Sequence, residues 1–184
     1  MTAPSDGAAV VVREALGRLP VEAVVDSARV RMVLPVTRVL GPAALAYVFL
    51  EGFRPVGAGA LPVERLSAAH PDVRKLEQAA GPGDAGEAAL EEVTSPVFVV
   101  RERGQVVAGA GYRVRAGTAA HLGVLTAPQA RGRGRARVVG AAAVAHALAA
   151  GLLPQWRARA FASRRVAAAL GFEELSAQLS FDIA

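Results

Sequence analysis

Residues 121–151, HLGVLTAPQARGRGRARVVGAAAVAHALAAG, decide the fold of this chain. A strand-like apolar run leads to Ala127-Pro128, a loop with four arginines and two glycines follows, and an alanine-rich, helix-like run continues to Gly151. In that order of elements, the first N–H groups of the helix lie directly after the strand and have no partner within the helix. Anions bind well at such a place, so the loop is a candidate anion-binding site.

The loop has the composition of a pyrophosphate cradle. Gly132 and Gly134 lack a Cβ, so the backbone can approach a ligand closely and adopt unusual φ values. The arginine side chains add charge-assisted hydrogen bonds. A Walker loop is excluded because Lys75 is the only lysine. A dinucleotide fingerprint is also excluded, because Arg137 stands where it needs a small residue and no acid follows about twenty residues on.

The pattern around this loop predicts an α/β (α+β) fold with a central mixed, mostly antiparallel sheet and flanking helices. Short glycine-containing gaps separate three β-rich runs before the loop, which indicates an antiparallel meander. After the helix, a strand, a short helix with Ser163 as its N-cap and a final strand follow, which requires a right-handed crossover. The expected strands are 97–101, 105–115, 120–126, 155–161 and 175–183, and the long helix is 134–150.

The first half of the chain has a weaker pattern. We expect a helix at 8–19, a strand at 29–40, and a second apolar segment at 44–53 after a Gly41-Pro42 junction. Further helical pieces are expected at 61–80, interrupted at Pro71, and a turn at 81–84 in which Asp84 caps a helix at 85–93. A division near residues 94–96 separates the two halves of what we expect to be a single domain, 1–184.

Composition narrows the class of protein further. The chain has 184 residues, a net charge of +5 and no cysteine, which excludes disulfides and thiolate metal sites. No pair of histidines has the spacing of metal ligands, so no metal is expected. The N-terminal stretch lacks the pattern of a secretory signal and no apolar run is long enough to span a membrane, so we expect a cytoplasmic protein without a membrane partner.

Two motifs in the second half resemble those of the GNAT superfamily of acyl-CoA-dependent N-acetyltransferases. The first is Gln129-Ala130-Arg131-Gly132-Arg133-Gly134, which matches Gln/Arg-x-x-Gly-x-Gly/Ala. The second is ASRRVAAALGFEEL, residues 162–175, a helix that ends in Leu-Gly-Phe. The resemblance covers roughly residues 97–184 and implies a sheet with two parallel strands that splay apart at the cofactor site.

The resemblance also implies the cofactor, acetyl-CoA, and the residues that hold it. The pantetheine arm would run along Val124, Leu125 and Thr126, and the loop would bind the pyrophosphate. Residues 96–184 would be the CoA-binding core, and residues 1–95 a divergent part on the acceptor side. The implied loop residues are Gln129, Arg131, Gly132, Arg133, Gly134, Arg135 and Ala136.

The catalytic groups are less evident, because the tyrosine that many family members use as an acid is replaced here by Ala167 and a frequent asparagine by Ala160. Acyl transfer to an amine requires a neutral amine, a stabilised oxyanion and support for the leaving thiolate. His121 is the best candidate base, since its ordinary pKa suits proton acceptance near neutrality. Ser163 and Tyr112 are candidate hydrogen-bond donors, with helix capping and core packing as their structural alternatives.

Three functions remain open from the sequence. The first is transfer of an acetyl group to a primary amine of a small molecule or protein, by direct attack in a ternary complex. The second is a catalytically degenerate acyl-CoA-binding or sensing protein, which Ala167 and Ala160 favour. The third, nucleic-acid binding through the arginines, is disfavoured because aromatic residues are only 5% of the chain. Formation of a homodimer is left open.

Overall fold

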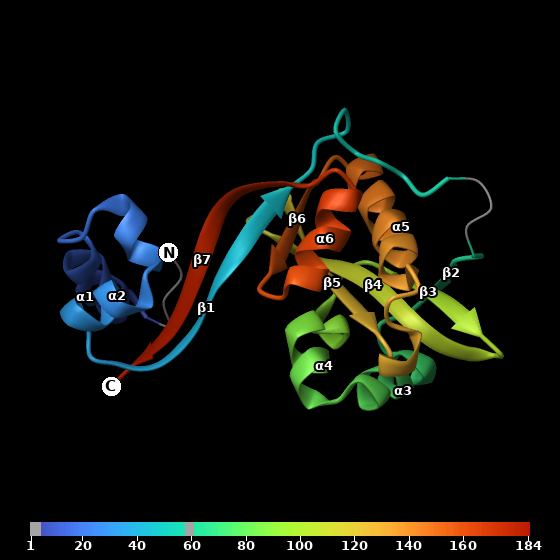
Figure 1. Ribbon diagram of the computed structural model, residues 1–184, viewed down its shortest axis with the longest axis horizontal. Helices are drawn as coiled ribbons and strands as arrows, with labels where there is room; N and C mark the ends of the chain where they lie inside the picture. The colour runs from blue at the N-terminus through green and yellow to red at the C-terminus, as the bar shows by residue number, and fades with distance from the viewer. Residues whose placement is uncertain (1–4, 58–60) are drawn as a thin grey trace. The chain divides into compact units, whose positions relative to one another are not determined.

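The computed structural model describes residues 5–57 and 61–184 and has two compact units (Figure 1). One unit comprises Met1–Leu45 with Ser176–Ala184, and the other comprises Ala46–Leu175. Residues 1–4, which belong to the stretch tested for a signal sequence, lie outside the described residues. The predicted division at 94–96, between an acceptor-side part and a CoA-binding core, stays a prediction.

The strands form one mixed sheet in the order β2-β3-β4-β5-β6-β1-β7. The neighbours from β2 to β5 pair antiparallel, whereas β5 and β6 pair parallel. The predicted mixed, mostly antiparallel sheet is therefore confirmed. In chain order, the strands are β1 (Val36–Tyr47), β2 (Glu64–Leu66), β3 (Val97–Glu102), β4 (Gln105–Arg115), β5 (Ala119–Thr126), β6 (Leu153–Ala158) and β7 (Glu173–Ile183).

Helices cover both faces of the strands in the unit 46–175 (Figure 1). On one face, α5 (Arg135–Ala149) and α6 (Phe161–Ala169) pack on a core that includes Val100, Leu122 and Trp156. On the other face, α3 (Pro71–Ala80), α4 (Pro82–Ala88) and the 3₁₀ turn η2 (Leu90–Glu92) pack on a second core. Because successive residues of a strand point to opposite faces, the side chains of β4 and β5 divide between these two layers.

Glycine lets α4 approach the sheet closely. A Cβ at Gly123 in β5 would lie 2.0 Å from the carbonyl oxygen of Ala88, the last residue of α4. A Cβ at Gly111, opposite Gly123 in β4, would lie 3.0 Å from the side chain of Val93. The end of α4 therefore rests on the backbone of β5, beside the strand's junction with β6.

The unit Met1–Leu45 with Ser176–Ala184 has a small core of its own. It holds α1 (Asp6–Leu16), η1 (Val21–Val25), α2 (Ser27–Val33) and most of β1 and β7. Val12, Ala15, Val30 and Leu34 are its buried side chains. Gly41 allows the two strands to approach, since a Cβ there would lie 2.9 Å from the carbonyl oxygen of Gln178.

The elements predicted for the second half are confirmed to within two or three residues, except for the cap of α6. Ser163 does not cap that helix, because α6 begins at Phe161 with Ala160 as its N-cap. The indole of Trp156 uses the Ser163 hydroxyl as an acceptor instead. The helix predicted at 134–150 is α5, preceded by η3 (Pro128–Ala130) and by Gly134 as N-cap.

Several elements predicted for the first half are wrong. The strand predicted at 29–40 begins as α2, because the Asp26 side chain accepts hydrogen bonds from the amides of Ala28 and Arg29 and caps a helix there. Strand β1 then runs through Gly41-Pro42, where we expected a junction between two segments. A central strand rarely contains proline, and this one does so where β7 lies close to its backbone.

The region 61–93 also differs from the prediction. Pro71 begins α3, since proline is well suited to the first helical position, whereas we expected it to interrupt a helix. Residues 64–66 form the short strand β2. The predicted cap at Asp84 is wrong, because α4 already begins at Pro82 and Asp84 lies within its first turn.

Candidate functional site: a gap between parallel strands

The candidate site begins where β5 and β6 separate. Their parallel pairing covers three positions, Ala119↔Leu153, Ala120↔Pro154 and His121↔Gln155, although β5 continues to Thr126 and β6 to Ala158. On its other edge, β5 stays paired with β4 along its whole length. The edge of residues 122–126 that faces β6 therefore carries backbone groups without a strand partner, which is the predicted splay of two parallel strands.

A cleft of about 630 Å³ passes through this gap. Leu122 and Val124 line it together with Leu125, and Trp156 lines it together with Arg157. Since neighbouring residues of a strand point to opposite faces, the cleft is lined from both faces of the sheet. A volume in this range suits a cofactor or a small substrate.

The glycine loop lies at one end of the cleft and presents its amides. Gly132 and Gly134 both have a φ of 74°, in the left-handed region, and both line the cleft. Among the described residues, no protein group accepts a hydrogen bond from the successive amides of residues 132–136. These amides lie at the N-terminus of α5, where the helix dipole is positive. The loop therefore offers an anion a row of hydrogen-bond donors, as the sequence predicted.

Carboxylates position some of the loop arginines. Arg131 pairs with Asp84 of α4, and its Nε donates to the carbonyl oxygen of Thr126 over 3.3 Å. Glu102 pairs with Arg135 over 2.6 Å and with Arg133 over 3.6 Å. These pairs fix the loop at both ends while its backbone amides stay available.

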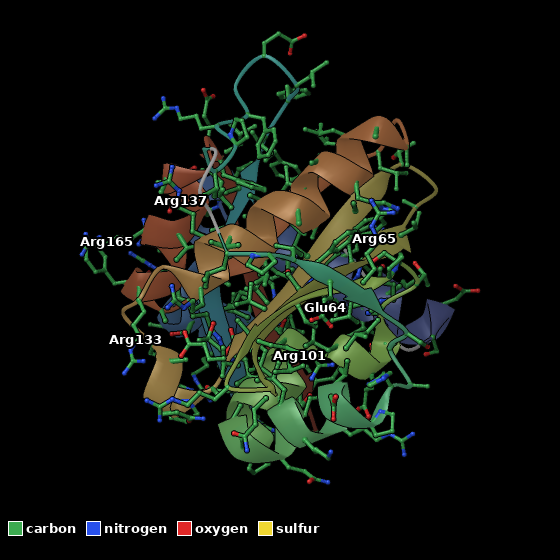
Figure 2. The ribbon with its side chains drawn as sticks, turned by 90° about the vertical axis from the view of Figure 1, so that its right-hand side faces the viewer. Glu64, Arg65, Arg101, Arg133, Arg137 and Arg165 are labelled. Atoms are coloured by element: carbon green, nitrogen blue, oxygen red, sulfur yellow. The ribbon has the colours of Figure 1, made fainter. Side chains whose placement is uncertain are left out.

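Arg137 and Arg165 also line the cleft. Figure 2 shows their side chains on the same side of the molecule as Arg133, whereas Glu64, Arg65 and Arg101 lie elsewhere on β2 and β3. No ion pair holds Arg137 or Arg165 within residues 5–57 and 61–184. The cleft is therefore positively charged on the side of the loop.

The strand segment Val124, Leu125 and Thr126 also has the features of a binding site. All three residues line the cleft. The Thr126 hydroxyl oxygen is buried and has no hydrogen-bond partner in the described part of the chain. A buried polar group is normally satisfied, so this hydroxyl is available to a ligand that lies along β5.

Gln129 is exposed at the start of the loop and is not among the residues that line the cleft, whereas Ala136 lines it. Apart from Gln129 and Arg133, every residue predicted to bind the cofactor contributes to this one cleft. Their assigned role as cofactor-binding residues stays a prediction.

His121 lies at the point where the strands part. Its Nδ1 is 2.8 Å from Oε1 of Gln155, and Nε2 of Gln155 donates to the Tyr47 hydroxyl over 2.7 Å. Because Oε1 can only accept, Nδ1 carries the hydrogen in the neutral ring and Nε2 of His121 is the unprotonated nitrogen. Burial, and then the charges of nearby arginines, lower the pKa of His121, while the bond to Gln155 opposes this shift. The ring is therefore neutral near pH 7, as a base must be, although His121 itself does not line the cleft.

The two predicted donors lie in different places. Tyr112 is buried on the α5 face, where its hydroxyl is 2.9 Å from Nδ1 of His146, and burial raises its pKa. It does not line the cleft, in agreement with the core-packing alternative.

Ser163 does line the cleft, and its Oγ accepts from Nε1 of Trp156 over 3.0 Å. The Ser163 hydroxyl hydrogen is thus directed away from the indole. Ala167 is buried in the core, and Ala160 lines the cleft.

Several residues of the site were not found from the sequence. Trp156 and Arg157 of β6 line the gap, and Asp84, Glu87 and Ala88 of α4 line its other side. Alternation in QWRARAF indicated that Trp156 and Arg157 point to opposite faces, but no local signal brings α4 to β5. In the described part of the chain, no group of three acidic or histidine side chains is arranged to hold a metal ion, and no helix has the length and apolar character to cross a bilayer.

The splayed parallel strands, the row of free amides and the cleft between the strands are the features that the resemblance implied for an α/β fold of this type. Residues 97–177 match the sequence model of the GNAT acetyltransferase family. The predicted resemblance to this family is therefore confirmed over residues 97–177. No curated protein matches the sequence.

Solved structures of the same family share the fold. A GNAT family structure from Novosphingobium aromaticivorans has a TM-score of 0.63 at 28% identity and covers 79% of this chain and 65% of its own. A GNAT family acetyltransferase from Colwellia psychrerythraea has a TM-score of 0.61 at 15% identity and covers 82% of this chain and 59% of its own. A GCN5-related N-acetyltransferase from Kribbella flavida has a TM-score of 0.59 at 20% identity and covers 83% and 61%. This chain therefore spans less than two thirds of the length of these proteins.

Proposed function

We propose that this chain is an acyl-CoA-dependent N-acyltransferase that moves an acetyl group from acetyl-CoA to a primary amine by direct attack in a ternary complex. The observation that carries the proposal is the end of β5–β6 pairing at His121↔Gln155, next to a cleft that leads to the unpaired amides of residues 132–136. This arrangement suits a ligand with an extended amide-bearing arm and a diphosphate.

The residues of the site suit acetyl-CoA. The free edge of β5 at Val124, Leu125 and Thr126 would hold the pantetheine arm as an additional strand, with the Thr126 hydroxyl as a further polar contact. The amides of residues 132–136 would hold the pyrophosphate at the N-terminus of α5. When bound, acetyl-CoA supplies an acyl group activated as a thioester. Cytoplasmic location and a small-molecule or protein acceptor remain part of the proposal.

Two side chains of the protein support the reaction, one as a base and one as a hydrogen-bond donor. His121, neutral and with Nε2 unprotonated, accepts a proton from the attacking amine, directly or through one water molecule. Ser163 lines the cleft with its hydroxyl hydrogen free of Trp156, so it donates a hydrogen bond to the departing sulfur. Tyr112 takes no part, since its hydroxyl is held by His146.

Calorimetric titration with acetyl-CoA, CoA and ATP, followed by a thiol-release assay with a panel of amines, tests the proposal. We expect micromolar binding of acetyl-CoA and CoA, little binding of ATP, and release of CoA thiol that depends on the amine. Tight acetyl-CoA binding without turnover on any amine would support the alternative, a degenerate sensing protein, which the buried Ala167 at the tyrosine position favours. Absence of CoA binding would refute both.

A further inference from the structure

A cluster of arginines surrounds His121 on the face of the sheet that α4 covers. Strand register places Arg113 of β4 opposite His121, and His121 opposite Gln155 of β6. Arg115 and Arg157 lie two residues beyond Arg113 and Gln155, so their side chains point to the same face as His121. Gly111 and Gly123, which meet Val93 and Ala88, identify that face as the α4 side.

Electrostatic effects agree with this placement. The charges of Arg115, Arg157 and Arg113 all act to lower the pKa of His121. Arg113 and Arg157 likewise contribute, after burial, to a lowered pKa of Arg115, while the charge of Glu92 opposes this shift. The guanidinium groups are thus close enough to repel one another and the protonated imidazole.

Two of these arginines form no ion pair in the described part of the chain. Arg113 pairs with Glu92 of η2, whereas no carboxylate of residues 5–57 and 61–184 forms an ion pair with Arg115 or Arg157. The carboxylates of α4 beside the cleft are engaged elsewhere, Asp84 with Arg131 and Glu87 with Arg159. Arg157 is half-buried and lines the cleft. A guanidinium that lines a cleft without a carboxylate partner is available to pair with an anionic ligand.

We propose that the acceptor amine carries a carboxylate near its nitrogen, and that Arg157 binds this carboxylate on the α4 side of the gap while the amine faces His121. The inference rests on the proposed acyl transfer and names its acceptor class, an amino-acid-like amine. Arginine suits this role because its planar guanidinium binds carboxylate through two parallel hydrogen bonds. The same positive charges favour the neutral form of the amine, which is the nucleophile.

An amino-acid-like amine is a narrower class than the small-molecule or protein amine that the sequence left open. An acid-rich cleft would select a polyamine or aminoglycoside, but Asp84, Glu87 and Glu92 on the α4 side are each paired with an arginine. Arg115 and Arg157 add positive charge on this face, and this charge repels polycations. A carboxylate on the acyl chain would pair with the same arginines. The experiment must therefore distinguish a carboxylate on the acceptor amine from one on the acyl chain.

The test compares matched amines with acetyl-CoA as donor. Initial rates are measured at pH 8 for each L-amino acid and its amide, such as leucine and leucinamide. We expect kcat/KM to favour the carboxylate by about tenfold or more for the best pair, as a charge-assisted contact would give. The less basic amide has the larger neutral fraction at this pH, so reactivity alone would favour the opposite order.

Variants assign the effect to Arg157. In Arg157→Ala, the acid-to-amide ratio of kcat/KM should fall about tenfold, because KM for the acid rises. Arg157→Lys should keep part of the preference for the acid. The affinity for acetyl-CoA, measured by calorimetry, should not change. Arg74→Ala is the matched control, because this α3 arginine donates to Ala69 and lines no part of the cleft.

Four outcomes would overturn the inference. Amides and acids used equally well would refute it while leaving acyl transfer intact. A preference for succinyl-CoA over acetyl-CoA that Arg157→Ala removes, without discrimination between amines, would assign the arginines to the acyl chain. Loss of acetyl-CoA affinity in Arg157→Ala with an unchanged acid-to-amide ratio would assign Arg157 to the cofactor. No acetyl-CoA binding and no turnover at all would refute the proposed function and this inference together.

Discussion

At the residue scale, the glycine loop can be tested with an internal control. Gly132→Asp and Gly134→Asp place a carboxylate beside the amides that would bind the pyrophosphate. The negative charge would repel the pyrophosphate, so we expect acetyl-CoA binding to be lost. Gly117→Asp is the control, since Gly117 in the β4–β5 turn has a φ of 75° and, like the loop glycines, no atom within 4 Å of a built Cβ. The three variants share the backbone strain, of about 1 kcal/mol, and differ in position. Calorimetry on folded variants would refute the cradle if Gly132→Asp and Gly117→Asp bound alike.

Also at the residue scale, His121 should produce a pH-dependent rate. In His121→Ala, acyl transfer should fall more at pH 7 than at pH 9, because at the higher pH more of the amine is already neutral and needs no base. The measurement is kcat/KM for one amine from pH 5 to pH 9.5 in both proteins. An equal loss at all pH values would assign His121 to structure.

The same histidine has a consequence for stability. Burial lowers its pKa below the ordinary value of 6.5, so folding favours the neutral ring. Its contribution is complete above pH 6.5 and is lost as the pH falls through the folded-state pKa. Urea denaturation should show that the wild type loses more stability than His121→Gln between pH 7.5 and pH 5. Parallel losses would contradict this.

At the scale of elements, the contact between β5 and α4 can be broken by one methyl group. Gly123→Ala places a Cβ 2.0 Å from the Ala88 carbonyl oxygen, which is backbone and cannot move without α4. We expect a loss of about 1–3 kcal/mol in unfolding free energy, as for other overpacked sites, together with weaker amine binding on the α4 side. Gly109→Ala on β4 is the comparison, because its Cβ would meet only side chains, at 3.2 Å or more. Equal destabilisation by the two variants would show that α4 adjusts freely.

At the scale of the whole molecule, the two compact units should differ in hydrogen exchange. The core cluster of the unit with α1 and α2 has four buried residues in the described part of the chain, whereas the unit 46–175 has two larger clusters. We therefore expect faster exchange of amides in α1 and α2. Acetyl-CoA should slow exchange in β5 and in residues 132–136 and leave α1 unchanged. Protection spread evenly over the chain would contradict this.

Much of the cofactor side was predicted from the sequence because its signals are local. Gly132 and Gly134 lie between a strand and a helix that are adjacent in the chain, so the sequence alone predicts that free amides meet a helix N-terminus. Alternation along β6 similarly predicts that Trp156 and Arg157 face opposite ways. The first half was predicted poorly because Pro71 begins a helix and Gly41-Pro42 lies within a strand, and tertiary contacts decide both.

The sequence by itself therefore determined the mixed sheet, the glycine loop and the resemblance of residues 97–177 to the GNAT family, since these depend on periodicity and on residues close together in the chain. Only the tertiary structure decided which side chains face the gap. It turned Tyr112 toward His146, placed Ser163 beside Trp156 and brought Arg115 and Arg157 around His121. These contacts join residues that are distant in the chain, through strand register and the packing of helices on the sheet, and no local pattern encodes them.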